Sequence, residues 1–346
     1  MGGAESLLVA LLPLLKSQIE VEVLLLDGSE SLLLDTLKKC NIKIITLSNK
    51  GLYDLSIVFK LFPILKNYDL VHVHLFPSMY YVALAKFLSR SNVKLVFTEH
   101  STSNRRLKSW FFRIIDRFIY LNYEKVVCIT PEVNDVLMNL GVSKEKLCVV
   151  YNGIELSKFS EAEAYNRAQF GLSENDIILV MVAAFRREKD HSLVFKSLCK
   201  LDDRYKLMLV GDGYLRSQRE LEVRELNLID RVAFLGNRDD VSSLLKTCNI
   251  GVLSSHWEGF GLAAVEAMAA GLPVVASNVP GLYDVVNGGG ILFRKGSVAD
   301  FCEKILALED GSYYNKVKER CINKAKKYDL HTTADGLVRL YKNLDR

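Results

Sequence analysis

The chain alternates short apolar runs, of the kind that form β-strands, with longer segments of helical character. In the first part of the chain the apolar runs cover residues 21–27, 42–47, 70–75, 94–98 and 125–130. Strands that alternate with helices usually pair side by side in one direction, so this pattern predicts a parallel sheet with helices on both faces. The expected fold class is therefore α/β.

The same pattern starts again after a polar segment that ends at Asp176. The second set of runs covers residues 177–185, 206–211, 232–236, 250–254, 273–277 and 290–293. At 346 residues the chain is two domains long, since one domain takes roughly 100–200 residues. We therefore predict two doubly wound domains, 1–150 and 151–346, with ligand sites at the carboxyl ends of their strands. The last stretch, Tyr313–Leu344, is expected to be helical.

Segment 249–277 carries the strongest functional signal in the chain. It has the pattern of a strand, a loop with Gly259 and Gly261, a helix over Leu262–Ala270 and a second strand. Glycine allows a ligand to approach the backbone closely. The free N–H groups at a helix start, together with the positive end of the helix dipole, favour a phosphate. The segment therefore predicts a phosphate site.

Two carboxylates, Glu258 and Glu266, flank this loop. A phosphate between two carboxylates would be repelled, so we expect each carboxylate to bind hydroxyl groups on one side of the phosphate. A sugar on one side and a ribose on the other satisfy that arrangement. The predicted ligand is a nucleotide diphosphate sugar.

The motif Glu258-Gly-Phe-Gly-Leu-x-x-x-Glu266, followed by Ala-x-Ala-x-Gly271-x-Pro273-Val-Val-Ala, resembles the E-x7-E signature of retaining glycosyltransferases of family 4. The resemblance implies the GT-B fold, with two Rossmann-like domains facing across a cleft, and leaves open whether the last helix crosses back to the first domain. It implies transfer from a nucleotide diphosphate sugar, UDP by default, to a glycan or lipid-linked acceptor in bacterial surface polysaccharide synthesis. No cofactor and no metal are expected.

By the same resemblance, most donor contacts come from the second domain. Segment 183–191 resembles the family's G-R-L-x-x-x-K-G, in which Lys189 matches the lysine. Ala184 replaces the arginine there, so Arg186 is expected to supply the missing charge and, with Lys189, to stabilise the leaving nucleotide. The expected catalytic residues are His100, Arg186, Lys189 and Glu258; the expected donor-binding residues are Gly2, Gly3, Gly211, Gly213, Arg238, Gly259, Phe260, Gly261, Leu262 and Glu266.

In the first domain, His100 follows an expected strand, at the position of the family's histidine that faces the transferred sugar. The expected acceptor-side residues are His74, Glu99, Asn104 and Arg105. In the family a strand precedes the glycine turn that Gly2 and Gly3 resemble, whereas here only Met1 does. We therefore expect a truncated start or an impaired product, with two strand edges left unpaired.

Composition narrows the possible partners and locations. A net charge of +4 argues against nucleic acid. Seven scattered cysteines without a C-x-x-C pair predict buried free thiols in a reducing compartment. No apolar run reaches the roughly 18 residues of a membrane span, and the start has no signal-peptide pattern. The expected location is cytoplasmic, or the inner face of the membrane.

Segment 105–120 interleaves arginines and a lysine with aromatic and aliphatic residues. A basic amphipathic helix of this kind either rests on an anionic membrane surface or packs normally with a solvated face. Membrane contact would favour a lipid-linked acceptor.

Other functions stay open at this level. A glycoside hydrolase would need two carboxylates facing each other across the scissile bond. A non-catalytic nucleotide-sugar-binding partner subunit agrees with Ala184 and the expected truncation, and a sugar-nucleotide epimerase is a weaker alternative. His72 and His74 share one strand face, but no third ligand at matching spacing supports a zinc site.

Overall fold

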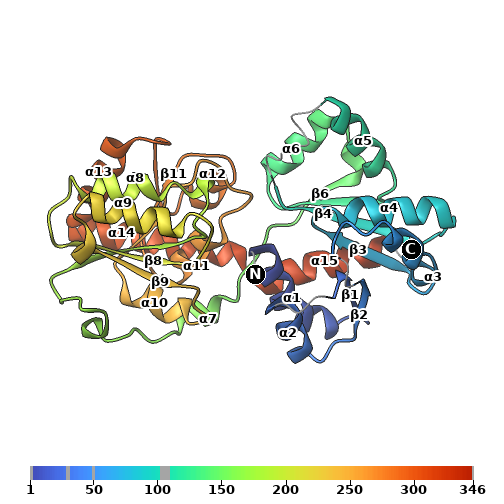
Figure 1. Ribbon diagram of the computed structural model, residues 1–346, viewed down its shortest axis with the longest axis horizontal. Helices are drawn as coiled ribbons and strands as arrows, with labels where there is room; N and C mark the ends of the chain where they lie inside the picture. The colour runs from blue at the N-terminus through green and yellow to red at the C-terminus, as the bar shows by residue number, and fades with distance from the viewer. Residues whose placement is uncertain (1–2, 29–31, 49–50, 102–109, 345–346) are drawn as a thin grey trace. The chain divides into compact units, whose positions relative to one another are not determined.

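The structure is a computed structural model that describes residues 3–28, 32–48, 51–101 and 110–344. Its contacts divide the chain into two compact units (Figure 1). Unit 1 holds residues 1–153 and 330–346, and unit 2 holds residues 154–329. Unit 2 is thus one continuous stretch of chain, whereas unit 1 takes in both ends.

Unit 1 contains a four-stranded parallel sheet in the order β3-β4-β5-β6 and a separate parallel pair, β1-β2. Its strands are β1 (Val23–Asp27), β2 (Ile44–Ser48), β3 (Leu70–His74), β4 (Lys94–Glu99), β5 (Lys125–Cys128) and β6 (Leu147–Val149). Within the described residues the two sheets share no ladder, so the end strands β1, β2, β3 and β6 each have one open edge. Whether two of these edges reflect a missing strand stays a prediction.

The helices of unit 1 are α1 (Gly3–Lys16), α2 (Leu32–Lys39), α3 (Ser56–Leu65), α4 (Ser78–Ser89), α5 (Trp110–Leu121), α6 (Pro131–Leu140) and α15 (Leu330–Leu344). Local signals explain the ends of α6. The Thr130 hydroxyl accepts a hydrogen bond from the Val133 N–H at 3.2 Å, Pro131 takes the first turn, and Gly141 ends the helix at φ 93°.

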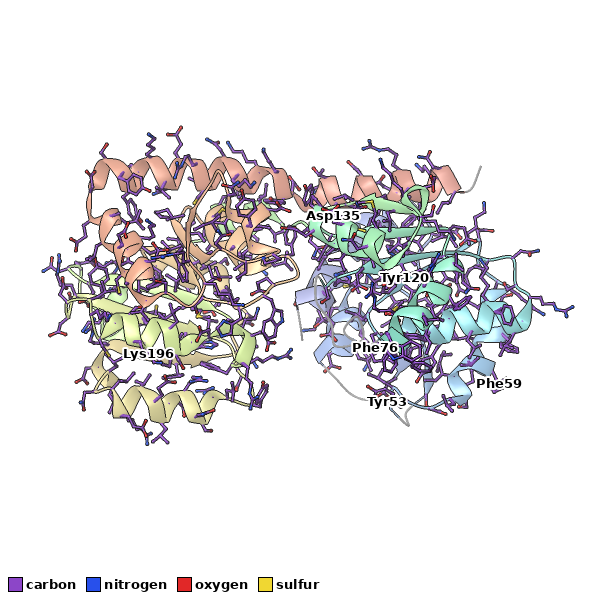
Figure 2. The ribbon with its side chains drawn as sticks, turned by 90° about the horizontal axis from the view of Figure 1, so that it is seen from above. Tyr53, Phe59, Phe76, Tyr120, Asp135 and Lys196 are labelled. Atoms are coloured by element: carbon purple, nitrogen blue, oxygen red, sulfur yellow. The ribbon has the colours of Figure 1, made fainter. Side chains whose placement is uncertain are left out.

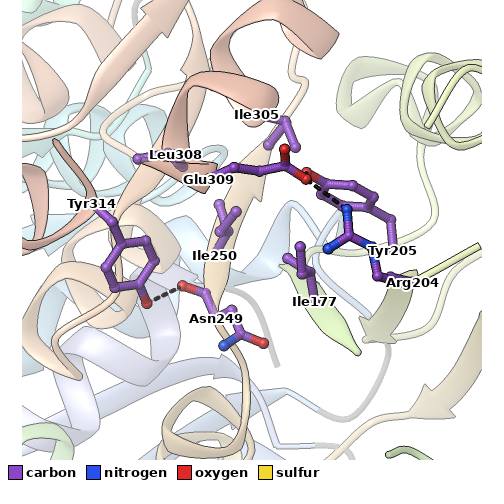
Figure 3. A pocket seen from close by; sticks show the side chains of 9 residues that line it. All are labelled: Ile177, Arg204, Tyr205, Asn249, Ile250, Ile305, Leu308, Glu309 and Tyr314. Carbon is purple, nitrogen blue, oxygen red and sulfur yellow. Dashed lines mark hydrogen bonds and ion pairs between the residues drawn. The ribbon is translucent and has the colours of Figure 1, made fainter. Parts of the chain in front are cut away.

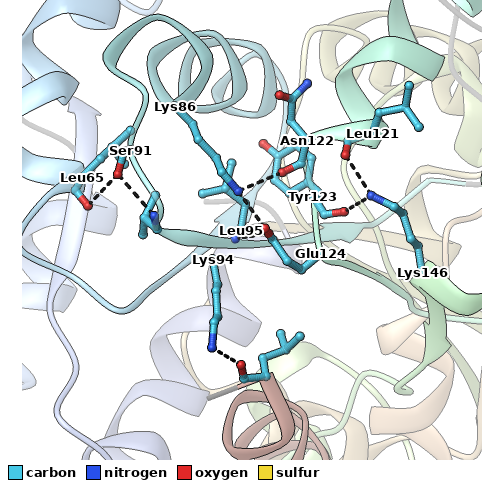
Figure 4. Close-up of polar contacts among 12 residues, drawn as sticks. Leu65, Lys86, Ser91, Lys94, Leu95, Leu121, Asn122, Tyr123, Glu124 and Lys146 are labelled. Atoms are coloured by element: carbon cyan, nitrogen blue, oxygen red, sulfur yellow. Dashed lines mark hydrogen bonds and ion pairs between the residues drawn. The ribbon is translucent and has the colours of Figure 1, made fainter. Parts of the chain in front are cut away.

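Polar contacts tie the elements of unit 1 together (Figure 4). Glu124 accepts a hydrogen bond from the Leu95 N–H at 2.5 Å and pairs with Lys86 of α4 at 2.7 Å. Lys94, at the start of β4, donates to the Leu344 carbonyl at the end of α15. The final helix is therefore anchored to the sheet of unit 1.

Unit 2 is built on a six-stranded sheet in the order β12-β11-β10-β7-β8-β9, parallel throughout. Its strands are β7 (Ile177–Val182), β8 (Tyr205–Val210), β9 (Val232–Gly236), β10 (Ile250–Leu253), β11 (Val274–Ser277) and β12 (Ile291–Phe293). Strands β10 and β11 are buried along their whole length. Burial on both faces explains why these strands are continuous apolar runs in the sequence.

The helices of unit 2 are α7 (Leu156–Ser160), α8 (His191–Leu198), α9 (Arg216–Glu225), α10 (Val241–Thr247), α11 (Leu262–Ala269), α12 (Leu282–Val286), α13 (Val298–Leu306) and α14 (Gly311–Ala325). The expected helical stretch 313–344 is divided in the structure. A 3-10 turn over Lys326–Tyr328 follows α14, and Asp329 is extended and pairs with Ile154 in a parallel bridge. α15, which begins after this break, belongs to unit 1.

All seven cysteines lie in the described ranges and are free thiols. The sequence predicts that they are buried, which is wrong for Cys199, because its side chain is exposed; Cys40 and Cys148 are only half-buried. In the part of the chain that the structure describes, every helix is too short or too polar to cross a bilayer.

Candidate active site

The loops at the carboxyl edge of the sheet in unit 2 hold most of the predicted donor residues. All six strands of this sheet run in one direction, so their carboxyl ends meet at one edge. The segments that follow β7, β8, β9 and β10 begin there and carry the following predicted residues: Arg186, Lys189, Gly211, Gly213, Arg238, Glu258, Gly259, Phe260 and Gly261. Ligands in open parallel sheets bind at this edge.

The glycine loop enters α11 as the sequence predicts. Gly261 is the N-cap of this helix at φ 91°, in the left-handed region that favours glycine, and it has no side chain with which to cap the first turn. The Phe260 ring is buried edge-on against Tyr328, with ring centroids 5.3 Å apart. Its side chain therefore belongs to the core, which leaves its backbone for contact with a donor.

Lys189 and Glu258 lie together at this loop. Lys189 Nζ is 2.5 Å from Glu258 Oε1, and both side chains are largely buried. The Ser255 hydroxyl donates to the same oxygen at 2.7 Å. Two residues predicted to bind different parts of the donor thus form an ion pair with each other.

Backbone contacts tie the two loops that carry this pair. The His256 N–H donates to the Glu188 carbonyl at 2.7 Å. The buried Ser254 hydroxyl lies 2.9 Å from the carbonyl oxygens of both Lys189 and Asp190. Asp190 itself is in the left-handed region at φ 46°, which aspartate adopts more readily than most residues with a side chain.

Glu266 lies on α11, in the second turn after the glycine loop. Burial raises the pKa of its carboxyl to about 7, and the positive charge of Lys158 opposes that shift. Near neutral pH a large share of this carboxyl is therefore protonated. A carboxyl in that state can both donate to and accept from the hydroxyl groups of a ribose.

Arg186 is exposed, directly before the short turn that holds Lys189. Its guanidinium is thus at the same loop as Lys189 and faces solvent. Arg238, in contrast, binds Asp240: its Nε lies 2.8 Å from Oδ1, and the Tyr165 hydroxyl donates to Oδ2 at 2.6 Å. The Arg238 charge is therefore already matched by a carboxylate.

Gly211 and Gly213 allow two loops to touch. A Cβ on Gly211 would lie 2.3 Å from the Ala183 carbonyl oxygen, and a Cβ on Gly213 would lie 2.7 Å from the Phe185 carbonyl oxygen. The Phe185 N–H donates to the Asp212 carbonyl at 3.1 Å. These glycines are therefore required by backbone packing whether or not a ligand binds there.

In unit 1, the predicted histidines meet at the carboxyl edge of the four-stranded sheet. His74 Nδ1, at the end of β3, lies 3.2 Å from Nε2 of His100, which follows β4. Burial lowers the pKa of both rings, to about 4 for His100 and well below its ordinary value for His74. Both rings are neutral at physiological pH.

The other site residues predicted in the first domain take no part in this histidine contact or lie outside the described residues. Glu99 is buried and accepts hydrogen bonds from the Tyr120 hydroxyl at 2.9 Å and the Ser101 N–H at 3.2 Å. It therefore supports the end of β4, and the contact of its carboxylate with an acceptor stays a prediction. Gly3 is exposed at the start of α1, whereas Gly2, Asn104 and Arg105 lie outside the described residues.

No group of three His, Cys, Asp or Glu side chains is arranged to hold a metal ion in the described ranges. The absence of a metal requirement stays a prediction. Several residues around the site were not predicted: Ser254, Ser255 and Asp190 in unit 2, and Thr98 and Tyr341 beside the histidines. Ser254 and Ser255 could have been found from their hydroxyls, since they come directly after β10.

A pocket of about 470 Å³ lies at the opposite edge of the sheet in unit 2 (Figure 3). Ile177, Tyr205 and Ile250, at the amino ends of their strands, line it. Its polar groups bind one another: Glu309 accepts from the Tyr205 hydroxyl at 2.9 Å and pairs with Arg204 at 3.0 Å. This pocket is remote from the glycine loop, and the polar groups that line it already bind one another.

Comparison with known proteins gives the family. The model of Glycosyl transferases group 1 matches residues 163–328, and that of Glycosyltransferase Family 4 matches residues 1–158. The N-acetyl-alpha-D-glucosaminyl L-malate synthase of Bacillus anthracis is 30% identical over 278 residues, which are 78% of this chain and 73% of that protein. The chain belongs to the group 1, family 4 glycosyltransferases.

A second curated relative and a solved structure are similar to this glycosyltransferase. The UDP-Gal:alpha-D-GlcNAc-diphosphoundecaprenol alpha-1,3-galactosyltransferase of Escherichia coli is 27% identical over 292 residues, 78% of this chain and 74% of that protein. The solved structure of Anabaena Alr3699/HepE in complex with UDP and glucose matches the glycosyltransferase with a TM-score of 0.87 at 21% identity, over 99% of this chain and 96% of that chain. The likeness confirms the predicted GT-B fold.

Proposed function

We propose that this glycosyltransferase is a retaining enzyme that moves a hexose from a UDP-sugar to a lipid-linked acceptor in surface polysaccharide synthesis. The observation that carries the proposal is the Lys189–Glu258 pair beside the glycine loop of α11. A cation, a carboxylate and the start of a helix at one place are the groups that a sugar diphosphate needs.

In this proposal the diphosphate binds at the start of α11 and draws Lys189 away from Glu258. Lys189 and the exposed Arg186 then neutralise the charge that develops on the leaving nucleotide. Glu258, which no longer pairs with Lys189, accepts a hydrogen bond from a sugar hydroxyl. Glu266 binds the ribose. His100 lines the reacting centre, and the leaving phosphate takes the acceptor's proton, so that the sugar is transferred on one face of the ring.

The names of similar proteins support the donor and the acceptor. The Escherichia coli relative is named for UDP-Gal and a diphosphoundecaprenol acceptor, and the Anabaena structure holds UDP and glucose. A Campylobacter jejuni relative, 26% identical over 291 residues, is also named for a diphospho-undecaprenol acceptor. A lipid-linked acceptor lies at a membrane surface, so the enzyme should bind there too.

Helix α5 of unit 1 supports membrane contact. Its buried side holds Asp116 and Tyr120, while apolar residues face outward: Trp110, Phe111, Phe112, Ile114, Phe118 and Leu121. An ordinary surface helix has the opposite arrangement. Arg113 and Arg117 are exposed on the same helix, which fits an anionic bilayer.

The neighbouring helices extend this apolar surface. α5 contacts α4, and α4 contacts α3. Phe87 of α4 is 70% exposed and Phe59 of α3 is 66% exposed; Phe59 and Tyr53 point outward from unit 1 (Figure 2). Aromatic side chains of this kind enter the bilayer interface. We call α3, α4 and α5 the apolar surface of unit 1.

The test is a panel of nucleotide sugars incubated with the purified enzyme. We expect slow donor hydrolysis with one UDP-sugar, transfer to a polyprenyl diphosphate sugar, and a product with the anomeric configuration of the donor by NMR. Glu258→Gln should weaken donor use and leave the fold intact. UDP binding by calorimetry with no hydrolysis or transfer for any donor would instead support the non-catalytic partner subunit, and an inverted product would remove the retaining mechanism.

A further inference from the structure

Five polar side chains form a cluster in unit 1, next to β3 and β4. His72 and His74 are two residues apart on β3, so they share one face of the strand. Thr98 on β4 and His100 just after it reach the same face, and Tyr341 joins them from α15. From the sequence, His74 and His100 are predicted to act separately, and no role is predicted for the cluster.

His72 is fully engaged within this cluster. Its Nδ1 lies 2.5 Å from the Tyr341 hydroxyl, and its Nε2 lies 2.7 Å from the Thr98 hydroxyl. Its ring also lies against that of His74, with centroids 4.2 Å apart and planes tilted by 34°. Two hydrogen bonds fix the ring of His72, and this fixed ring supports one face of His74.

His74 in turn contacts His100 through nitrogen. Its Nδ1 lies 3.2 Å from Nε2 of His100, and the two ring centroids are 5.5 Å apart. In a hydrogen bond between two neutral imidazoles, one nitrogen donates its proton and the other accepts. This hydrogen bond therefore occupies Nε2 of His100, so that Nδ1 is the ring nitrogen that can bind a ligand.

We propose that His74 is a positioning residue that fixes the ring orientation and the tautomer of His100. The inference rests on the proposed role of His100 at the reacting centre. A group that must meet a sugar hydroxyl gains from being held in place before the substrate arrives, because its orientation then costs no entropy during the reaction. The partner of one histidine nitrogen also sets the protonation of the other.

The backbone beside His74 supports the same role. Leu75, the next residue, is in the left-handed region at φ 66°. For a leucine this conformation costs about 1–2 kcal/mol, and strained residues of this kind gather where a side chain must be held in one direction. The end of β3 thus turns sharply just after His74.

Two substitutions separate a hydrogen-bonding role from a packing role. His74→Phe keeps a ring against His72 and removes Nδ1, whereas His74→Asn removes the ring and places an amide nitrogen or oxygen at the position of Nδ1. If His74 positions His100, His74→Phe lowers kcat by about 10–100-fold with the donor KM within threefold, by analogy with metal-binding histidines that lose the hydrogen-bond partner of their second nitrogen. His74→Asn then stays within a few fold of wild type.

A packing role predicts the opposite order, with His74→Phe close to wild type and His74→Asn impaired, and that result would overturn the proposal. His74→Gln provides a third variant, because its amide reaches the position of Nε2 and misses that of Nδ1. It should behave like His74→Phe. If His74→Phe does not fold, the comparison of His74→Asn with His74→Gln decides the question.

A second measurement needs no substrate. With 15N-labelled histidine, the two nitrogens of His100 should have the chemical shifts of one neutral tautomer in the wild type and in His74→Asn, and averaged shifts in His74→Phe. Identical His100 shifts in the wild type and in His74→Phe would overturn the inference. If the wild type itself lacks turnover with every donor while these shifts change as expected, the proposed function fails and the positioning role of His74 stands.

Discussion

The ammonium of Lys189 lies 2.5 Å from Oε1 of Glu258, although 69 residues separate them in the chain. The structure therefore pairs the cation expected to bind the diphosphate with the carboxylate expected to bind the sugar. A donor that binds at the glycine loop has to exchange this contact for two new ones, in which each charge meets its own part of the donor. Before a donor binds, the charges of Lys189 and Glu258 neutralise each other.

Loss of the Lys189 charge should slow the reaction strongly. We expect Lys189→Ala to lower kcat by about 10²–10³-fold, the usual loss for one preorganised group that stabilises a developing charge. Single-turnover donor hydrolysis measures this effect, with Lys295→Ala, an exposed lysine after β12, as the matched control. Activity of Lys189→Ala within a few fold of wild type would remove the proposed role.

The Glu266 carboxyl should make the stability of unit 2 depend on pH. Its pKa rises from an ordinary value of 4.5 to about 7 on folding, so between these pH values the native state holds a proton that the unfolded state has released. Stability therefore falls as pH rises from about 4.5 to 7.

The variant Glu266→Gln removes this titration. At pH 8 it should be more stable than the wild type by up to about 3 kcal/mol, since one pKa unit corresponds to about 1.4 kcal/mol. At pH 4.5 the difference should be small. Urea unfolding at both values tests this, and an equal difference at both would mean that the carboxyl does not titrate in this window.

A close backbone contact holds the Glu258 loop. A Cβ on Gly281, at φ 81°, would lie 2.4 Å from the Glu258 carbonyl oxygen. Gly288 has nearly the same φ, 82°, with open space around it, so Gly288→Ala should cost about 1–2 kcal/mol from backbone strain alone. Gly281→Ala should cost about 1–3 kcal/mol more, because the added methyl group overpacks the loop. Equal costs in chemical denaturation would show that the loop moves aside freely.

The apolar surface of unit 1 should bind anionic vesicles. We expect co-sedimentation with vesicles that contain phosphatidylglycerol and much weaker binding to phosphatidylcholine alone, because Arg113 and Arg117 need anionic lipid. Phe111→Ser combined with Phe118→Ser should reduce binding at least about tenfold, because the loss of each ring removes apolar area that would be buried in the bilayer. Leu221→Ser, which replaces an exposed leucine in unit 2, is the control. Unchanged binding of the double variant would exclude this helix as the contact.

The sequence predicted the features that local rules control. The start of α11 follows from Gly261 and the run of helix formers after it, and the parallel sheet of unit 2 follows from its apolar runs. The resemblance also brought Lys189 and Glu258 to one site. Their direct pairing was not predictable, because it depends on how two loops from distant strands pack.

Tertiary packing also accounts for the predictions that differ. Glu99 follows an expected strand with no local signal for burial, yet it is buried and its carboxylate accepts a hydrogen bond from Tyr120 of α5. The break at Asp329 interrupts a stretch with continuous helical character, because this residue pairs with Ile154 far away in the chain. Tyr341 reaches His72 only because α15 returns to unit 1. None of these contacts has a local signal.

The return of α15 has a consequence for protein engineering. The chain enters unit 2 at Ile154 and leaves it at Asp329, and there the Ile154 N–H donates to the Tyr328 carbonyl at 2.9 Å. Entry and exit are thus adjacent, the arrangement that permits one domain to be inserted into another. We therefore expect that unit 2 can be exchanged for that of a relative through two cuts whose ends already meet.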